Sequence, residues 1–251
     1  LSLGGRVDSV DGRNVFPTWR ATVAYMIEQT GTKLRASAGT GAKAPSLYQR
    51  FSMYGTPNLR PEHNVGYDAG IDQNLFDNRL KLSVTAFDSR YRDLFGFDPF
   101  ANNFVGAYIN IGRARISGVE TSADVIVVPD AWRLRASYTR QRAIDLDRQQ
   151  VLKLTPRDKG SLSVIYAGIQ KFEVETRVTL VGRRMDTMND FPFARVRLAP
   201  YAKVDARASY GVSDNVSVFV RAENMTNARY QEIRDYGVAG RSYYAGMQVT
   251  W

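Results

Sequence analysis

Residue types that support catalysis or metal binding are scarce in this chain. Its 251 residues contain no Cys and a single His, His63. The lack of Cys excludes a disulfide, a thiolate zinc site, an iron–sulfur cluster and a thiol nucleophile. One His excludes multi-histidine metal sites and leaves little room for a Ser/His/Asp triad. No glycine-rich phosphate loop, nucleophile elbow or metal-spaced cluster stands out. We therefore expect no enzyme, no cofactor and no metal centre.

One loose acidic set is the exception. Asp88, Asp93 and Asp98 lie near one another in the sequence, and carboxylates spaced along a loop can hold Ca²⁺. The alternative is that all three are solvated loop acids. The sequence leaves both interpretations open.

Aromatic and basic residues gather in segments that are typical of loops. Aromatic rings with a few charges suit a large, partly apolar and often anionic chelate. The candidate ligand-binding residues are Tyr54, Phe95, Phe97, Tyr108, Arg183, Arg184, Arg229, Tyr230, Arg234 and Tyr236. For each of them, contact with a membrane interface or with lipopolysaccharide is the alternative.

The strongest pattern along the chain is an alternation with a period of two. In residues 132–139, for example, Trp132, Leu134 and Ala136 alternate with Arg133, Arg135 and Ser137. Because successive side chains of a strand point to opposite faces, each such segment has one apolar and one charged face. We count about twelve such segments of roughly 9–16 residues, the length of tilted membrane strands.

The connections between these segments alternate in length. Short turns are expected near 28–31, 76–78, 129–131, 168–170 and 211–214, and long loops near 9–17, 42–60, 93–107, 143–152, 185–199 and 225–239. Short turns on one side and long loops on the other indicate an all-β, antiparallel transmembrane β-barrel. Its mean hydropathy of −0.33 is compatible, because alternating strands average to a polar value. A soluble β-sandwich is the alternative, but its strands are usually about 5–6 residues long.

The net charge of +9 belongs to the polar strand faces, because the 34 basic residues are spread over many strands and form no stripe. We therefore expect no nucleic-acid partner. In a barrel these faces line the lumen. The expected wall residues are Lys33, Arg35, Arg79, Lys81, Arg133, Arg135, Arg177, Arg183, Lys203, Arg207 and Arg221, offset by Asp68, Asp72, Glu120, Asp124, Glu173, Glu175, Asp205 and Glu223.

Four motifs occur in order along the chain. Residues 37–48 resemble a strand-to-loop segment ending in Phe-Arg-Ala-Pro, with Ala42-Lys43 replacing Phe-Arg. Residues 55–62 resemble Gly-Asn-Pro-Asn-Leu-x-Pro-Glu, with Thr56 replacing the first Asn. Residues 110–120 and 222–246 resemble an Asn-x-Gly-x-Ala-x-Ile-x-Gly-Val-Glu strand and a closing hairpin. The signature residues are Pro45, Pro57, Asn58, Leu59, Pro61, Glu62, Gly118, Val119, Glu120, Asn224, Gly240, Arg241 and Trp251.

Together these motifs resemble the C-terminal half of the β-barrel of TonB-dependent outer-membrane receptors, most closely the vitamin B12 (cobalamin) transporters and siderophore receptors. The resemblance implies TonB-dependent uptake of cobalamin or a ferric siderophore across the outer membrane of a Gram-negative bacterium. It implies contact with outer-membrane lipid and lipopolysaccharide, with a plug domain, with TonB through the plug, and with the barrel-assembly machinery through the C-terminal strand. The haem branch of the family is similar but has a His between the Ala-Pro and the Pro-Asn-Leu boxes. No His lies between Pro45 and Pro57 here, so haem is disfavoured as the ligand.

The resemblance also implies that the chain is too short to form a complete barrel of this family. Family barrels have about 22 strands, so residues 1–251 are expected to be the C-terminal part of a barrel, without its plug domain. The chain begins with Leu1 and not with Met, which fits the expectation of a processed chain or a fragment. Alternatively, residues 1–8 pair with residues 240–251, and the chain closes as a smaller pore acting as a passive porin-like channel or structural barrel.

Gly118 marks a place where the alternation slips. Arg113 and Arg115 share a parity with Val119, Thr121 and Ala123. A glycine at such a slip suits a β-bulge or a strong local twist.

Overall fold

The structure, a computed structural model, describes residues 1–10, 14–188 and 191–250. Twelve strands follow one another in a single antiparallel sheet. They are β1 (Ser2–Val10), β2 (Asn14–Ile27), β3 (Thr32–Lys43), β4 (Glu62–Leu75), β5 (Leu80–Arg92), β8 (Arg113–Val128), β9 (Trp132–Asp145), β11 (Asp158–Ile169), β12 (Phe172–Val181), β15 (Tyr201–Gly211), β16 (Val216–Glu223) and β17 (Ser242–Val249). The expected all-β fold and strand number are confirmed.

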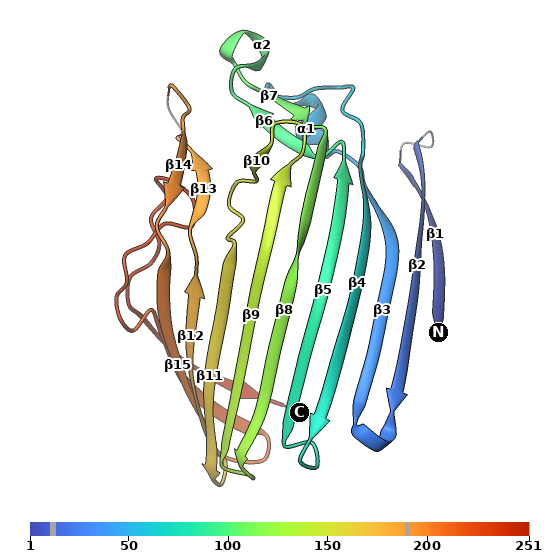
Figure 1. Ribbon diagram of the computed structural model, residues 1–251. Coiled ribbons are helices and arrows are strands. Elements are labelled where there is room, and N and C mark those ends of the chain that lie inside the picture. Colours follow the sequence, from blue (N-terminus) through green and yellow to red (C-terminus); the bar gives the residue numbers. More distant parts are fainter. Residues whose placement is uncertain (11–13, 189–190, 251) are drawn as a thin grey trace.

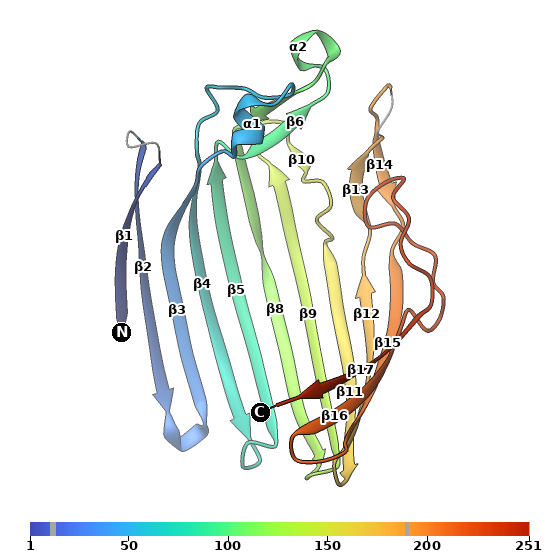
Figure 2. The ribbon, with the colours of Figure 1, turned by 180° about the vertical axis from the view of Figure 1, so that it is seen from behind.

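The sheet curves into an open trough with the two terminal strands at its edges (Figures 1 and 2). Within the described part of the chain, β1 pairs only with β2, and β17 pairs only with β16. The pairing of residues 1–8 with 240–251 that a smaller closed barrel requires is therefore not found. Each edge strand presents backbone N–H and C=O groups to a further strand.

Tight turns at one end of the sheet lie where the sequence predicts them. The other end carries the larger connections (Figure 1). These contain α1 (Leu47–Phe51), the β6 (Phe95–Asp98)–α2 (Ala101–Phe104)–β7 (Ala107–Asn110) unit, β10 (Gln150–Val151) and the hairpin of β13 (Arg184–Thr187) and β14 (Arg195–Leu198). A single 3₁₀ turn, η1 (Glu28–Thr30), joins β2 to β3. Among the described residues, no helix is long and apolar enough to cross a membrane.

Two predicted long loops are wrong. Residues 9–17 belong largely to β1 and β2, which pair as far as Val10 and Asn14, and residues 11–13 lie outside the described residues. Pro17 suggested a loop, but β2 pairs with β3 only from Arg20 onward, so a proline is tolerated beyond that point. In the segment 143–152, β9 continues to Asp145 and β10 returns along its edge.

The alternation places apolar side chains on one face across many strands. Ala136, Leu162, Val178 and Val204 lie directly opposite one another on β9, β11, β12 and β15. Leu162 is 45% exposed, and an apolar row on the outside of a curved sheet is typical of a membrane β-barrel. At this height charged side chains such as Arg135 and Arg177 occupy the opposite, concave face.

Gly118 carries no bulge, contrary to the sequence interpretation. Its register is continuous on both sides, opposite Phe87 on β5 and Gln141 on β9. The irregularity of β8 lies between Ile126 and Val128. Gly118 is needed for space, because an added Cβ would lie 2.3 Å from the Arg140 carbonyl oxygen and 2.9 Å from the Phe87 ring. The apparent slip arises because the outer face of β8 is charged at Arg113 and Arg115 and becomes apolar from Val119 onward.

Candidate functional site

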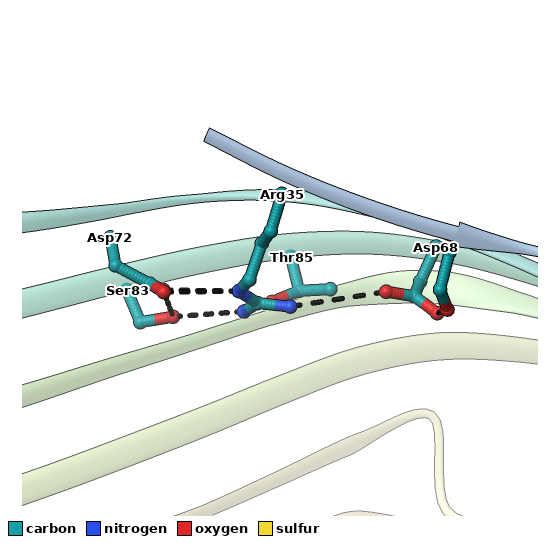
Figure 3. Close-up of polar contacts among 6 residues, drawn as sticks. Arg35, Asp68, Asp72, Ser83 and Thr85 are labelled. Carbon is teal, nitrogen blue, oxygen red and sulfur yellow. Dashed lines mark hydrogen bonds and ion pairs between the residues drawn. The ribbon is translucent and has the colours of Figure 1, made fainter. Parts of the chain in front are cut away.

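The inner wall carries ion-paired side chains, and some of these pairs bridge neighbouring strands. Arg35 of β3 lies between Asp68 and Asp72 of β4, with its Nε 3.1 Å from Asp72 Oδ2 and its Nη1 3.9 Å from Asp68 Oδ1 (Figure 3). Its Nη2 donates to Ser83 Oγ at 3.2 Å and Thr85 Oγ1 at 2.5 Å on β5. One guanidinium thus connects three strands.

Arg133 and Arg135 of β9 also pair across strands, with Asp124 of β8. The further ion pairs of the wall each lie within one strand, and they are Arg177 with Glu175, Lys203 with Asp205, and Arg221 with Glu223. Glu120 lies in the same face, opposite Thr139. Arg183 is an exception to the predicted wall, because it lies beyond the end of β12 and lines a different hollow. A wall of this kind can exchange hydrogen bonds with a polar partner in the lumen.

An aromatic cluster forms above the wall from two connections that are distant in the sequence. Phe97 of β6 lies edge-on to Tyr54 and to Tyr108 of β7, at centroid distances of 5.7 and 5.5 Å. Tyr48 of α1 adds an edge contact to Tyr108 at 6.1 Å, and the sequence interpretation missed it as a ligand candidate. The Tyr108 amide donates to the Tyr54 carbonyl at 2.9 Å, which joins the two connections.

The proline-rich signature shapes the loop that carries Tyr48 and Tyr54. Ser46 and Gln49 form a capping box at the start of α1, which stabilises this short helix. A cavity of about 570 Å³ lies beside it. Its lining includes Phe16 and the signature residues Pro45, Pro57, Asn58, Leu59 and Pro61. The fixed φ of each proline lowers the entropy lost when this loop is ordered.

Glu62 ties the next candidate, Phe95, to the sheet. Its Oε1 accepts the Phe95 amide at 2.6 Å, and its Oε2 lies 3.7 Å from Lys43 Nζ. Lys43 in turn lies 5.5 Å from the centre of the Phe95 ring. Phe95 is therefore held in place beside the aromatic cluster.

A second cluster combines the basic and aromatic candidates of the later loops. Tyr230 stacks on Tyr201, with ring centroids 3.9 Å apart and planes 14° apart. The Arg184 guanidinium lies 5.0 Å from the Tyr201 centroid, and its Nη2 donates to the Gln231 carbonyl at 2.6 Å. Arg184 is 5% exposed, and its Nε is buried without a hydrogen-bond partner. Burial raises the pKa of the Tyr230 phenol.

The ten ligand candidates do not converge on one pocket. The Arg234 amide donates to Asp186 Oδ2 at 2.8 Å beside the second cluster. Arg229 is exposed, and Tyr236 is 64% exposed on the same loop. Arg183 lines a hollow together with Arg140, Arg142, Arg157 and Arg197, none of which the sequence interpretation selected. The signal was present for Arg140 and Arg142, which continue the parity of Tyr138.

The closing-hairpin signature has a clear structural basis in Asn224. This residue is 2% exposed and adopts a left-handed φ of 49°. Its side chain accepts from the Ala228 amide at 2.8 Å and donates to the carbonyls of Ala228 and Ala239 at 3.0 and 3.3 Å. Both ends of the 225–239 loop are thus held by one amide group.

The remaining signature residues have simpler positions. The Arg241 amide donates to Asn227 Oδ1 at 3.1 Å, and an added Cβ on Gly240 would lie 2.8 Å from that oxygen. Val119 is 41% exposed on the outer face. Trp251 lies outside the described residues.

The acidic set is not brought together as a calcium site. Asp88 pairs with Arg90 and Arg115, and Asp93 lies 2.5 Å from Arg60. Asp98 accepts the Phe100 amide within its own turn. Among the described residues, no group of three or more His, Cys, Asp or Glu side chains is placed to hold a metal.

Fold and geometry together define the wall of a β-barrel, with a charged inner face, an apolar outer face and folded loops at one end. Residues 1–225 match the family described as "TonB dependent receptor-like, beta-barrel", and the chain belongs to this family. It is 30% identical over 244 residues to a vitamin B12 transporter, BtuB, of Photobacterium profundum. That match covers 96% of this chain and 39% of the relative. A BtuB of Vibrio cholerae is 26% identical over 223 residues, covering 84% and 33%.

Solved structures show the same fold at low sequence identity. The ferric enterobactin receptor PfeA of Pseudomonas aeruginosa aligns with a TM-score of 0.79 and 18% identity, over 99% of this chain and 42% of that one. The copper transporter OprC aligns with a TM-score of 0.77 and 15% identity, over 95% and 40%. The chain thus spans 33–42% of the length of these proteins.

Proposed function

We propose that this chain is the C-terminal part of the barrel of an outer-membrane receptor in a Gram-negative bacterium. The receptor takes up a large, scarce ligand, cobalamin or a ferric siderophore, with energy delivered through TonB, and it is not an enzyme. The observation that carries the proposal is the inner wall of ion-paired side chains, of which Arg35 with Asp68 and Asp72 is the best example. Membership of the receptor family supports it.

The inner wall and the two edge strands support the following roles for the partners. Charged side chains on the concave face hold a plug domain by hydrogen bonds and ion pairs, and the plug transmits the pull of TonB. The free edges of β1 and β17 bind the remaining barrel strands, since open edges are not tolerated in lipid. The C-terminal strand is the part that the barrel-assembly machinery recognises.

Ligand capture belongs to the loops. The cluster of Tyr48, Tyr54, Phe97 and Tyr108 offers an apolar surface. The second cluster, formed by Tyr201 and Tyr230, adds the basic side chain of Arg184. Such a combination suits a bulky chelate with few polar anchors. The relatives' names support both ligand classes, because they include vitamin B12 transporters and a ferric enterobactin receptor.

Uptake by whole cells tests the proposal. The complete receptor containing this chain is expressed in a strain that lacks its own cobalamin and siderophore receptors. Uptake of labelled cyanocobalamin or of a ferric siderophore is then measured with and without a functional TonB. We expect saturable uptake of one of them that disappears without TonB. TonB-independent leakage of sugars that is graded by size in a liposome swelling assay would instead establish the passive channel.

A further inference from the structure

A hollow of about 750 Å³ lies at the loop end of the sheet. Here β9 continues to Asp145, whereas β11 pairs with it no further than Arg140. Residues 152–157 leave the edge of β9 and reach β13, where the Leu154 amide donates to the Met185 carbonyl at 2.8 Å. β10 and β13 lie on either side of this connection (Figure 1). The hollow is bounded by β9, the connection and the hairpin of β13 and β14.

Positive charge is concentrated in this arginine hollow. Among the described residues, its lining contains six arginines, Arg140, Arg142, Arg157, Arg183, Arg184 and Arg197. In the same part of the chain, the one carboxylate within ion-pair distance of any of them is Asp158, 4.0 Å from Arg140 Nε. The inner wall differs, since Arg35 there has two carboxylates. Because like charges around one space repel one another, the hollow favours a ligand that brings several negative charges.

Arg184 is the buried member of this set. It is 5% exposed, and its Nε has no hydrogen-bond partner. The rest of the guanidinium is engaged, because Nη2 donates to the Gln231 carbonyl at 2.6 Å and the group packs 5.0 Å from the Tyr201 centroid. A buried N–H group without an acceptor is unfavourable. An anionic oxygen in the hollow would supply the acceptor that Arg184 lacks.

The same side chain joins the hollow to the 225–239 loop. Gln231, which accepts from Arg184, belongs to that loop. Two residues beyond Arg184, Asp186 Oδ2 accepts the Arg234 amide of the same loop at 2.8 Å. A ligand that holds Arg184 from the hollow therefore also stabilises the contact of this strand with the loop.

We propose that the arginine hollow binds the negatively charged oxygens of the transported ligand, and that this ligand is a multiply charged ferric chelate and not cobalamin. Guanidinium groups bind anionic oxygens in pairs. A ferric catecholate complex presents several such oxygens, whereas cobalamin carries only the charge of its phosphodiester. The volume of about 750 Å³ is typical of ligand sites. The inference rests on the proposed function, whose ligand class it narrows, and occupancy of the hollow fastens the 225–239 loop through Arg184.

Ligand binding by the complete receptor tests the site. The receptor is purified in mild detergent and titrated by calorimetry with two charged chelates, ferric enterobactin and ferric citrate. Ferrichrome, an uncharged ferric chelate, cyanocobalamin and inorganic pyrophosphate are titrated in parallel. The double variant Arg142→Gln with Arg183→Gln removes two exposed charges from the hollow. Its matched control, Arg6→Gln with Lys171→Gln, removes two charges from exposed ion pairs elsewhere. Heat-modifiable migration confirms that each variant is folded.

We expect a charged chelate to bind more tightly than ferrichrome or cyanocobalamin. The double variant should lose about tenfold or more in affinity for it, since charged hydrogen bonds contribute at least that much, and the control should bind like wild type. Unchanged affinity in the double variant would overturn the proposal, as would binding of neither charged chelate or tightest binding of an uncharged chelate or cyanocobalamin. Pyrophosphate binding as tight as that of the chelate would indicate a site for free anions and would overturn it too.

Arg184→Lys tests the link between the hollow and the loop. A lysine keeps the charge and can donate to the Gln231 carbonyl, but it lacks the planar fork whose Nε is free for a ligand. In the wild type, the charged chelate should slow trypsin cleavage at Arg229 and Arg234 severalfold. In Arg184→Lys, cleavage should be equally fast with and without the chelate. Equal protection of both proteins would contradict the role of Arg184.

Uptake by whole cells separates this inference from the proposed function. TonB-dependent uptake of cyanocobalamin that Arg142→Gln with Arg183→Gln leaves unchanged would overturn the arginine site and leave the proposed function standing. Arginine-dependent binding of a charged chelate without any TonB-dependent uptake would contradict the proposed function and leave the site standing.

Discussion

Tyr201 and Tyr230 lie face to face, with ring centroids 3.9 Å apart and an angle of 14° between the planes. Tyr201 begins β15, whereas Tyr230 belongs to the loop between β16 and β17. Stacking therefore fixes a long loop to the rigid wall of the sheet. The Arg184 guanidinium packs against Tyr201 as well.

Replacing Tyr230 by Ala is expected to release this loop and to weaken ligand capture. An aromatic pair contributes about 0.5–1.5 kcal/mol beyond its buried area, so the loop should open severalfold more often. Arg229 and Arg234 provide trypsin sites within it, and the initial rate of cleavage there measures the opening. Tyr230→Phe should behave like wild type, and so should Tyr243→Ala, whose side chain points outward. Equal cleavage of Tyr230→Ala and wild type would contradict the role assigned to the stack.

Arg35→Gln is expected to destabilise the wall by about 1–3 kcal/mol, because Asp68 and Asp72 lose a shared charged donor. Arg6→Gln is the matched control. Arg6 also pairs with a carboxylate, Asp8, but its side chain is 75% exposed, and exposed pairs contribute about 0–1 kcal/mol. Thermal unfolding followed by heat-modifiable migration compares the two. Restoration of stability when Asp72→Asn is added to Arg35→Gln would confirm that the loss comes from unpaired charge.

The strands and their faces were predictable because they depend on local alternation. Val178 and Arg177, for instance, are adjacent in sequence and occupy opposite faces in the structure. Turns such as 129–131 were predictable for the same reason. The loop predicted at 9–17 failed because Pro17 is tolerated where β2 has a neighbour on one side only, which depends on how far β3 extends.

The candidate site was less predictable because its contacts join distant segments. Sequence pattern identified Tyr54, Phe97 and Tyr108 as aromatic loop residues, and the structure brings them together. The sequence pattern could not distinguish these three residues from Tyr236, which is exposed in the structure. The arginine hollow was missed because basic residues were assigned to the lumen, whereas Arg140 follows the outward parity of Tyr138.

Asn224→Ala is expected to lower stability by about 1–3 kcal/mol, because the backbone groups of Ala228 and Ala239 lose their hydrogen-bond partner on the buried Asn224 side chain. Asn224→Gly removes the same hydrogen bonds but tolerates the left-handed φ of 49°. It should therefore lose about 1 kcal/mol less than the Ala variant. Thermal unfolding of both variants separates the contribution of the side-chain hydrogen bonds from that of the left-handed backbone conformation. Identical losses would show that the backbone conformation contributes nothing.

Acid is expected to loosen the β9–β10 turn only at unusually low pH. The Arg113 amide donates to Asp147 Oδ2 at 2.9 Å, and its guanidinium donates to Oδ1. The backbone N–H and then the guanidinium hold the pKa of Asp147 below its ordinary value of 3.8. Because the folded-state pKa is depressed, the stabilisation is complete above the unfolded pKa and is lost as pH falls through the folded one. The chain has no Cys, so a spin label at Arg148→Cys reports the mobility of this turn. Its mobility should rise only below about pH 4, whereas Asp147→Asn should make the turn mobile at every pH. A midpoint above the ordinary carboxyl range would contradict the contact.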